Sequence, residues 1–419
     1  MITGRSKKIA DLHESTVIAQ RYFLKWLHYS FNQRRNSTMV STSNIESTPK
    51  SGRKVYTAPG MRSLEFEEKK VVSFFEFWPT WLIYLPVGLQ WLILSIRYGS
   101  LTLPLLANPK LPLSGMVGVP KSELLEQATG CCEQAILPWR IHVVNTESPE
   151  LQAESLMMRL KAEGFTLPLV CKPDIGCRGS GVKLVHSLEQ VAAYIQSYPL
   201  NTRVMLQKLA SWEPEAGIFF VREPGQAEGK IISLALKYSP YVEGDGVHTL
   251  KQLIEKDPRA SQLQHLYLER HADRLNDVLA DGEAYRLVFS ASHCRGAVFR
   301  DARDIITPKL TDSLNRIMAD LPEFYYGRLD IKFSNEQRLS EGEDLEIIEI
   351  NAASSESLHI WDSRTGFIEA MSALLLQYRT LFRLGAFHRR RGFRTPGVKE
   401  FWRRLQSERN LSKYYPETD

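Results

Sequence analysis

Apolar and polar positions alternate most regularly in the last third of the chain. Residues 326–333 read YGRLDIKF and residues 345–351 read LEIIEIN, and both runs are rich in β-branched and aromatic side chains. Such runs predict β-strands. The stretch 334–344 between them is polar and contains Asn335 and Gly342, which predicts a connecting loop. We therefore expect two neighbouring strands joined by a loop.

Charged side chains occupy one face of each predicted strand. Because successive side chains of a strand point to opposite faces, Arg328, Asp330 and Lys332 share one face of the first strand. Glu349 and Asn351 share one face of the second strand for the same reason. If the two faces meet, Asp330, Glu349 and Asn351 converge as oxygen donors of the kind that Mg²⁺ prefers. The alternative is a hairpin with one solvated polar face.

A glycine-rich loop between two short apolar runs is the second informative pattern. Residues 167–185 read LPLVCKPDIGCRGSGVKLV, which predicts a strand ending at Lys172, a glycine loop and a second strand. No helix follows the glycines, and the Gly-Lys-Ser/Thr ending of a Walker loop is absent. Glycines let backbone N–H groups approach phosphate oxygens, and Lys172 would add positive charge. The alternative is an ordinary glycine-rich hairpin, in which Cys177 has no neighbouring base to make it reactive.

The rest of the pattern predicts a chain of mixed helices and strands. Helices are expected where apolar positions recur near a 3.6-residue period or follow capping signals, and strands at short apolar runs. The expected helices cover residues 154–164, 187–198, 367–381 and 399–406, and the expected strands cover 141–144, 203–209 and 217–222. Residues 167–222 would then form a small α+β lobe built as hairpin, helix and hairpin.

Residues 78–96 form the most apolar run and contain no charged side chain. A run of this length can span a bilayer. Pro79, Pro86, Gly88 and Gln90 argue against spanning, because they add polarity and are expected to interrupt a continuous helix. We expect a buried segment or a peripheral contact with a membrane surface, with insertion into the membrane as the alternative.

Composition narrows the class of protein. The 419 residues are 43% hydrophobic, which suits two or three globular domains, and the net charge of +5 comes from a basic stretch in residues 1–63. No interleaved basic and aromatic platform indicates nucleic-acid binding. The five cysteines include no C-x-x-C pair, which argues against a disulfide framework or structural zinc and favours a cytoplasmic location. Residues 1–62 read as a disordered tail, with a basic membrane-surface or targeting helix as the alternative.

Five motifs between Leu167 and Trp361 resemble, in order, those of the ATP-grasp superfamily. They read VCKPDIGCRGSGV, LQKLASWEPEAGIFFV, YVEGDGVHTLKQLI, FYYGRLDIKF and EIIEINAASSESLHIWD. The nearest branch is that of the carboxylate–amine ligases, which includes D-alanine–D-alanine ligases and cyanophycin-synthetase-like enzymes. The resemblance implies an α+β fold of two lobes that grip a nucleotide, after a shortened N-terminal α/β region and an apolar helical segment.

The resemblance also implies domain boundaries. We expect a basic tail (1–62), an apolar helical segment (63–107), a short α/β region (108–165), a small lid lobe (166–235), a large lobe with the Mg²⁺ site (236–376) and a basic C-terminal helix or tail (377–419). The C-terminal part is expected to be a solvated helix, with anionic lipid or an acidic partner as the alternative.

Site residues carried over from the resemblance fall into four groups. Nucleotide binding is assigned to Lys172, Gly176, Gly179, Ser180 and Gly181 at the phosphates, to Gln207, Lys208 and Leu209 at the adenine, and to Glu215 at the ribose, with Glu213 as its rival. Asp330, Glu349 and Asn351 match the metal ligands. Arg328, Lys237 and Arg300 match positions that contact phosphoryl groups or substrate during catalysis. Glu356 and His359 are candidate substrate contacts, with helix-cap and surface roles as the alternative.

The activity implied is ATP-dependent ligation of a carboxylate to an amine through an acyl phosphate, with release of ADP and phosphate. The resemblance implies ATP and two Mg²⁺ ions, for which Mn²⁺ could substitute, and small-molecule carboxylate and amine substrates. Nucleic acid is not an expected partner, and residues 78–96 are the expected place for membrane contact. Two alternatives remain: a nucleotide-binding or phosphotransfer protein without ligase activity, and a membrane-attached scaffold.

Overall fold

The computed structural model describes residues 54–65, 78–176 and 179–419. Residues 54–65 and 84–419 belong to one compact unit, and residues 78–83 belong to a second unit. The elements below lie in the first unit, except that helix α2 (Thr80–Tyr98) begins in the second. The predicted basic tail lies outside the described residues up to position 53, as does Cys177 in the glycine loop.

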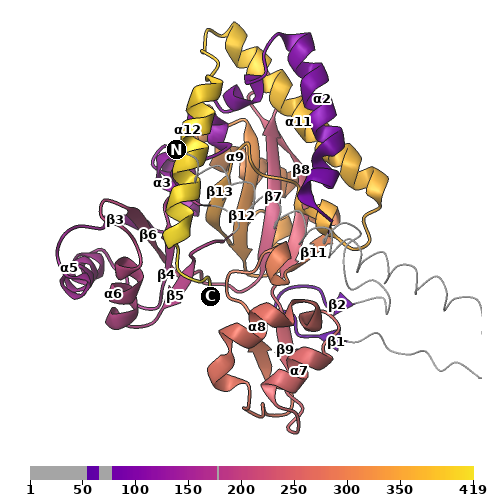
Figure 1. The fold of residues 1–419 in the computed structure, drawn as a ribbon. Helices are drawn as coiled ribbons and strands as arrows, with labels where there is room; N and C mark the ends of the chain where they lie inside the picture. The colour runs from indigo at the N-terminus through magenta and orange to yellow at the C-terminus, as the bar shows by residue number, and fades with distance from the viewer. Residues whose placement is uncertain (1–53, 66–77, 177–178) are drawn as a thin grey trace, which may run out of the picture. The chain divides into compact units, whose positions relative to one another are not determined.

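The largest sheet is antiparallel and has the strand order β11-β8-β7-β12-β13 (Figure 1). Its strands are β7 (Glu215–Arg222), β8 (Gly229–Tyr238), β11 (Val298–Asp301), β12 (Tyr326–Phe333) and β13 (Leu345–Asn351). The sequence predicted β12 and β13 with these bounds. The predicted loop between them contains a short helix, α10 (Glu336–Ser340), because the side chain of Asn335 caps it.

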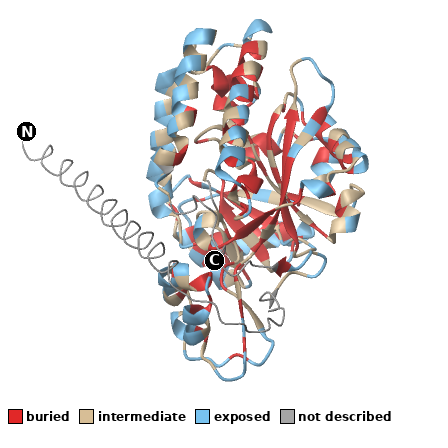
Figure 2. Ribbon diagram, turned by 90° about the vertical axis from the view of Figure 1, so that its right-hand side faces the viewer, coloured by how far each residue is buried: buried red, intermediate tan, exposed pale blue. Residues whose placement is uncertain are grey.

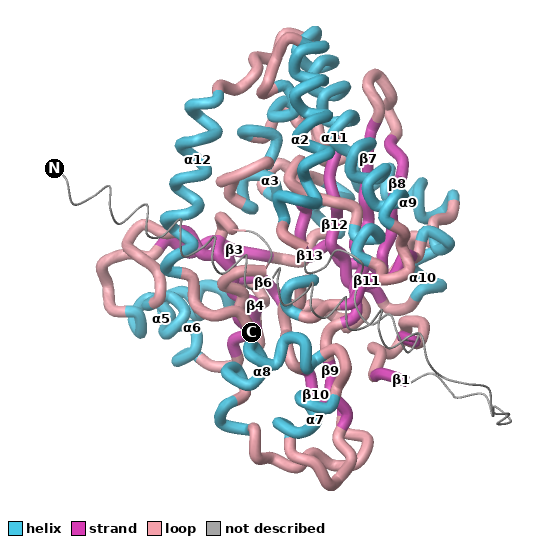
Figure 3. Tube along the Cα trace, turned by 45° about the vertical axis from the view of Figure 1, so that its right-hand side comes forward, coloured by secondary structure: helices cyan, strands magenta, loops and turns pink. Residues whose placement is uncertain are grey.

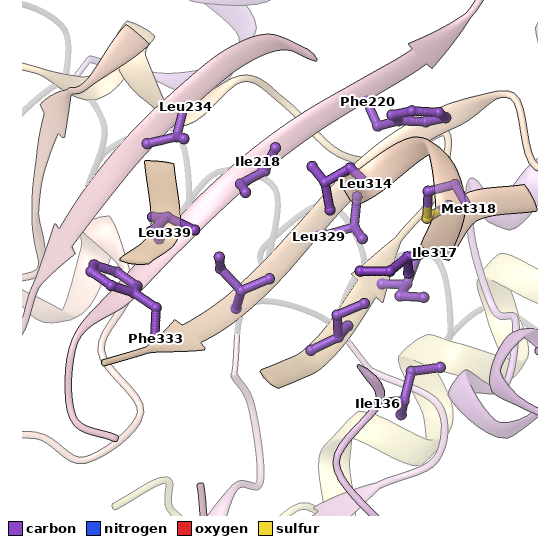
Figure 4. Packing of buried hydrophobic residues seen from close by; sticks show 14 of the residues in the cluster. Ile136, Ile218, Phe220, Leu234, Leu314, Ile317, Met318, Leu329, Phe333 and Leu339 are labelled. Atoms are coloured by element: carbon purple, nitrogen blue, oxygen red, sulfur yellow. The ribbon is translucent and has the colours of Figure 1, made fainter. Parts of the chain in front are cut away.

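One face of this sheet carries the main apolar core. Ile218, Leu234 and Leu329 pack there against Leu314 and Met318 of α9 (Pro308–Ala319), as Figure 4 shows. Each fully buried side chain of this size contributes roughly 1.5–3 kcal/mol relative to the same side chain left exposed. Figure 2 shows how strongly burial concentrates in these strands. Alternate residues of the same strands therefore face the other way, and several of them are charged.

The smaller sheet is also antiparallel, with the order β3-β6-β4-β5. Its elements are β3 (Trp139–Val143), β4 (Leu169–Pro173), β5 (Lys183–Val185) and β6 (Arg203–Lys208), and helices α5 (Pro149–Ala162) and α6 (Leu188–Gln196) complete its core. The sequence placed strand 217–222 in this lobe. Instead β7 is a central strand of the larger sheet, since it is buried at nearly every position and must be covered on both faces.

A third group of elements follows β8 and has its own core. It comprises β9 (Tyr241–Glu243), α7 (Leu250–Lys256), α8 (Gln264–Arg270) and β10 (Ala284–Arg286). A hairpin of β1 (Lys54–Val55) and β2 (Leu64–Glu65) contacts it through the rings of Tyr56 and Tyr241, whose centroids are 4.4 Å apart. Residues 54–62 of the predicted tail are therefore structured.

Helix α2 lies beside α11 (Phe367–Arg390), as Figures 1 and 3 both show. The rings of Trp91 and Tyr98 lie 5.4 and 6.0 Å from the ring of Phe382. The prediction that Pro86 and Gly88 interrupt the helix is wrong, because α2 continues through them. A proline removes one backbone hydrogen bond, and packing on α11 offsets this loss. Within the described ranges, no helix combines the length and apolar character needed to cross a membrane.

The remaining helices border the two sheets. Helices α3 (Lys121–Leu125) and α4 (Gly130–Ala135) precede β3, and α12 (Val398–Leu411) replaces the predicted helix 399–406. Arg404 and Glu408 of α12 hydrogen-bond the backbone of Gly118. Figure 1 shows the chain then ending beside β4 and β5.

Candidate functional site

Charged side chains stand in register across four strands, on the face of the large sheet opposite its apolar core. Asp330 on β12 lies directly opposite Glu349 on β13. Lys332 on β12 lies opposite Glu215 on β7, which in turn lies opposite Lys237 on β8. Directly opposed residues of antiparallel strands share a face, so these side chains are neighbours. The prediction that the polar faces of β12 and β13 meet is confirmed.

The ladder between β12 and β13 is interrupted beside the Asp330–Glu349 pair. The residue after Asp330, Ile331, lies opposite Ile347, so Ile348 has no opposite residue. This irregularity is a β-bulge. It keeps Ile347 in the apolar core and still leaves Glu349 on the polar face.

The three predicted metal ligands converge. Asn351 Nδ2 donates a hydrogen bond to Asp330 Oδ2 at 2.9 Å, and Glu349 lies directly across the ladder. Burial raises the pKa of Asp330, although the neighbouring Arg328 opposes the shift. Burial acts on Glu349 in the same way, but Lys121 and other nearby cations lower its pKa below the usual range.

The donor types of this cluster suit Mg²⁺, since two carboxylates and a carboxamide offer hard oxygen ligands. Nowhere in the described ranges does a group of three His, Cys, Asp or Glu side chains stand ready to hold a metal ion. At the predicted site, the carboxamide of Asn351 would be a third ligand beside Asp330 and Glu349.

Three hydrogen bonds hold the guanidinium of Arg328 in place. Its Nε and Nη2 donate to the two carboxylate oxygens of Asp330 at 2.6 and 3.0 Å, and its Nη1 donates to the backbone oxygen of Glu356 at 3.2 Å. A Cβ at Gly217 on β7 would lie 3.1 Å from Cδ of Arg328 and 2.4 Å from a methyl carbon of Leu358. A glycine at 217 therefore makes room for the arginine.

Glu215, the predicted ribose ligand, lies between two lysines. Its carboxylate oxygens are 2.5 Å from Lys237 Nζ and 3.1 Å from Lys332 Nζ. Burial would raise the pKa of Glu215, but the two lysines lower it to about 2. Its rival Glu213 accepts hydrogen bonds from the hydroxyls of Tyr56 and Tyr241 at 3.2 and 2.5 Å. Both carboxylates are thus ionic or hydrogen-bonded within the protein.

Lys172 connects the small lobe to β13. Its Nζ donates to Gln207 Oε1 at 2.8 Å and to the backbone oxygen of Ile348 at 3.0 Å. Burial lowers the pKa of Lys172 to about 8. Of the other predicted adenine contacts, Lys208 places its ammonium over the ring of Phe165, and Leu209 is exposed.

Lys121 joins the glycine loop to the metal-ligand cluster, and the sequence analysis did not identify it. Its Nζ donates to the backbone oxygen of Gly176 at 2.6 Å and lies 3.6 Å from Glu349 Oε1. Buried Asp174 fixes the start of α3, because it accepts from the backbone and hydroxyl of Ser122 at 2.9 and 2.8 Å. Arg203 Nε also lies 2.8 Å from Asp174 Oδ2. A charged residue directly after the Lys172-Pro173 pair was the available signal for Asp174.

The glycine loop thus begins one lysine away from Glu349 of the β12–β13 hairpin. The chain resembles ATP-grasp ligases. No family model and no curated protein matches the sequence.

Solved structures similar to this chain include ligases and synthetases. A bifunctional glutathione synthetase from Pasteurella multocida matches at 13% identity and a TM-score of 0.32, over 65% of this chain and 38% of its own. A D-alanine–D-alanine ligase from Bacillus anthracis matches at 11% identity and a TM-score of 0.36, over 68% of this chain and 71% of its own. A D-Ala:D-Ser ligase from Enterococcus faecalis matches at 11% identity and a TM-score of 0.32, over 62% of this chain and 63% of its own. At TM-scores this low, these structures assign no role to any residue of this chain.

The remaining residues suggested by the ATP-grasp resemblance are Glu356, His359 and Arg300. Glu356 adjoins Arg328 through its backbone, and burial raises the pKa of its carboxyl to about 7. His359 is buried, and its Nδ1 is 2.7 Å from the hydroxyl of Ser233 on β8. Arg300 instead forms a buried ion pair with Asp362 at 3.0 Å. The geometry therefore brings Glu356 to the cluster and commits Arg300 to Asp362.

Gly179, Ser180 and Gly181 complete the predicted phosphate loop. The backbone nitrogen of Gly181 donates to Thr418 Oγ1, and that hydroxyl donates to the backbone oxygen of Gly179, both at 2.9 Å. No pattern in the sequence indicated that residues near position 418 would reach this loop.

Proposed function

We propose that this protein is an ATP-dependent ligase that joins a small-molecule carboxylate to an amine. The observation that carries the proposal is the position of Lys121, which contacts both the glycine loop at Gly176 and the candidate metal ligand Glu349. Lys172, Arg328, Lys237 and Lys332 add positive charge around the carboxylates. A site with this surplus of cations suits the triphosphate of ATP.

The proposed reaction has two steps. A carboxylate oxygen of the substrate attacks the γ-phosphorus of ATP, the bond to the bridging oxygen of ADP breaks, and an acyl phosphate forms. The amine nitrogen then attacks the acyl carbon, phosphate leaves with the bonding electron pair, and the nitrogen loses a proton. Arg328 and Lys172 would stabilise the charge that develops on the phosphoryl oxygens, because their positions are fixed before reaction.

Asp330, Glu349 and Asn351 would hold Mg²⁺, which neutralises charge on the β and γ oxygens when bound. The glycine loop would keep water from the acyl phosphate, which water would otherwise hydrolyse.

Replacing the metal ligands tests this assignment. Glu349→Gln and Asp330→Asn should each abolish amine-dependent ADP release, since an amide binds Mg²⁺ far more weakly than a carboxylate. The measurement is phosphate and ADP release from purified protein with ATP, Mg²⁺ and pooled amino acids. Circular dichroism checks the fold, and Glu343→Gln in the β12–β13 connection is the matched control. Unchanged turnover in either ligand variant would remove the metal assignment.

A nucleotide-binding or phosphotransfer protein without ligase activity is the second candidate. The bidentate contact of Arg328 with Asp330 favours this candidate. Both carboxylate oxygens of Asp330 already accept hydrogen bonds, so they are less available to the metal ion that ligation needs. Calorimetry with ATP and Mg²⁺ separates the candidates: this one requires ATP binding without amine-dependent ADP release.

We also propose that α2 rests on an anionic membrane surface. Within residues 84–98 of this helix, five large apolar side chains are more than half exposed and recur at helical spacing: Leu85, Leu89, Leu92, Ile93 and Ile96. An apolar groove of about 620 Å³ lies beside them, between α2 and Tyr378 of α11. Exposed Arg97 and Arg389 stand where the two helices end together, and cations suit anionic lipid headgroups. Sedimentation with vesicles tests this placement.

A further inference from the structure

Residues 415–419, called the strap here, run along the glycine loop. Thr418 is buried, and its hydroxyl bonds Gly179 and Gly181 as described above. The backbone nitrogen of Asp419 donates to Val182 O at 2.9 Å, and the nitrogen of Leu184 donates to Asp419 Oδ2 at 2.8 Å. The other carboxylate oxygen lies 2.6 Å from Lys183 Nζ. Thr418 and Asp419 thus contact the chain between residues 179 and 184, which covers the end of the loop and the start of β5.

Tyr415 secures the first part of the strap. Its hydroxyl donates to the backbone oxygen of Ile175, and its ring lies 5.7 Å from the ring of Tyr198 in the core of the small lobe. A Cβ at either Gly176 or Gly181 would come within 3.2 Å of a Tyr415 side-chain atom. The glycines at both ends of the loop therefore leave space for Tyr415, a role that phosphate binding does not require.

The strap also contacts the elements that follow β8. The backbone nitrogen of Ser290 donates to the backbone oxygen of Asp419 at 2.8 Å, and Arg270 of α8 lies 3.4 Å from Glu417. A Cβ at Gly179 would lie 2.6 Å from the Ser290 hydroxyl, so the loop itself adjoins this region. The strap therefore fastens the loop of the small lobe to a different part of the chain.

We propose that Thr418 and Asp419 are positioning residues for the phosphate loop and that they must release it when nucleotide enters or leaves. The proposal rests on the function proposed above. The hydroxyl of Thr418 occupies the N–H of Gly181, which is the type of backbone donor that phosphate oxygens bind in glycine loops. ATP and the strap would compete for this loop, so weakening the strap should accelerate both binding and release of ATP.

Thr418→Val tests the proposal, because valine keeps the shape of threonine and removes both hydrogen bonds. We expect about tenfold faster amide hydrogen exchange at residues 179–184, because the two hydrogen bonds that hold this end of the loop are lost. Stopped-flow measurements with ATP and Mg²⁺ should show association and dissociation both accelerated. Thr418→Ser keeps the hydroxyl and should behave as wild type, and Lys413→Ala, outside the strap, is the control.

Each outcome decides the matter. Unchanged exchange in Thr418→Val overturns the strap as a positioning element, whatever the protein binds. Faster exchange with unchanged rates of ATP association and dissociation also overturns the proposal, since the strap would then stabilise the loop without affecting nucleotide binding. Faster exchange in a protein that never binds ATP refutes the proposed function instead.

Discussion

At the scale of single residues, the site is defined by how each charge is paired. Glu215 has two lysines, Asp330 has a bidentate arginine, and the ammonium of Lys172 donates to neutral oxygens of Gln207 and Ile348. A buried cation with neutral partners loses its proton more easily than one beside a carboxylate. Because burial lowers the pKa of Lys172 to about 8, its charge changes near that pH.

The affinity for ATP should fall as pH rises through about 8. Burial lowers the pKa of Lys172 to that value, so its ammonium form, which attracts phosphate, is lost above it. Loss of a charged hydrogen bond costs about 1.5–3 kcal/mol, which is a loss of affinity of about tenfold or more. Calorimetric titration with ATP and Mg²⁺ measures the affinity at each pH. A range from about pH 6.5 to about pH 9.5 covers about 1.5 units on either side of the pKa of Lys172. Burial of the charged lysine also costs stability below pH 8, and that cost fades as pH rises.

Lys172→Arg provides the matched control, because arginine keeps its charge throughout this range. Its affinity for ATP should stay level where that of the wild type declines. An equal decline in both proteins would show that a different group titrates.

At the scale of secondary-structure elements, β7 and β12 form the site jointly. Arg328 projects from β12 into space left open on β7 at Gly217, and Lys332 reaches across to Glu215. The strands are adjacent and antiparallel, so these contacts follow from their register. A small change on β7 should therefore be felt by a residue on β12.

Gly217→Ala should displace Arg328 and impair catalysis more than folding. The added Cβ would meet Leu358 at 2.4 Å and Arg328 at 3.1 Å. Overpacking of this kind costs about 1–3 kcal/mol of stability. Thermal unfolding measures the loss of stability. The rate of ADP release should fall by more than this loss of folded protein explains. Gly225→Ala, whose Cβ meets nothing within 4 Å but whose φ of +79° carries its own strain, calibrates the stability cost alone. Activity lost equally in both variants would refute the role of Gly217.

The strands of the site could be predicted from sequence because alternation and β-branched residues mark them directly. Asp330 and Glu349 were found in this way, and the register confirms that they face each other. Lys121 could not be found, since it is the first residue of a short helix and reaches the site only because Asp174 anchors that helix. The same limit applies to Thr418: contacts between residues far apart in sequence leave no local periodic signal.

At the scale of the whole molecule, the described chain carries features outside the ATP-grasp motifs. Helix α2 exposes an apolar stripe, α12 lies along Gly118, and the strap follows it to the glycine loop. The last motif ends at Asp362, so the resemblance predicts none of these contacts. The continuity of α2 through Pro86 likewise depends on packing against α11 that the local sequence does not reveal.

Leu89→Asp combined with Ile93→Asp should abolish binding to vesicles that contain anionic lipid. Both side chains are exposed on α2, and a charge on the apolar face opposes its burial among acyl chains. Co-sedimentation with vesicles of mixed neutral and anionic lipid measures binding, and high salt should weaken it in the wild type. Met158→Asp, on the exposed face of α5, is the matched control. Binding that persists in the double variant, or wild-type protein that stays in the supernatant or only self-associates, would contradict the proposal.

The bulge at Ile348 gives β13 one residue more than regular pairing with β12 needs. Excising that residue would give an uninterrupted ladder in which Ile347 stays opposite Ile331 and Glu349 stays opposite Asp330. The carboxylates would keep their face, but Lys172 would lose the backbone oxygen of Ile348, to which its ammonium donates. The extra residue of β13 therefore supports the contact with the small lobe, and the pairing of the two strands does not depend on it.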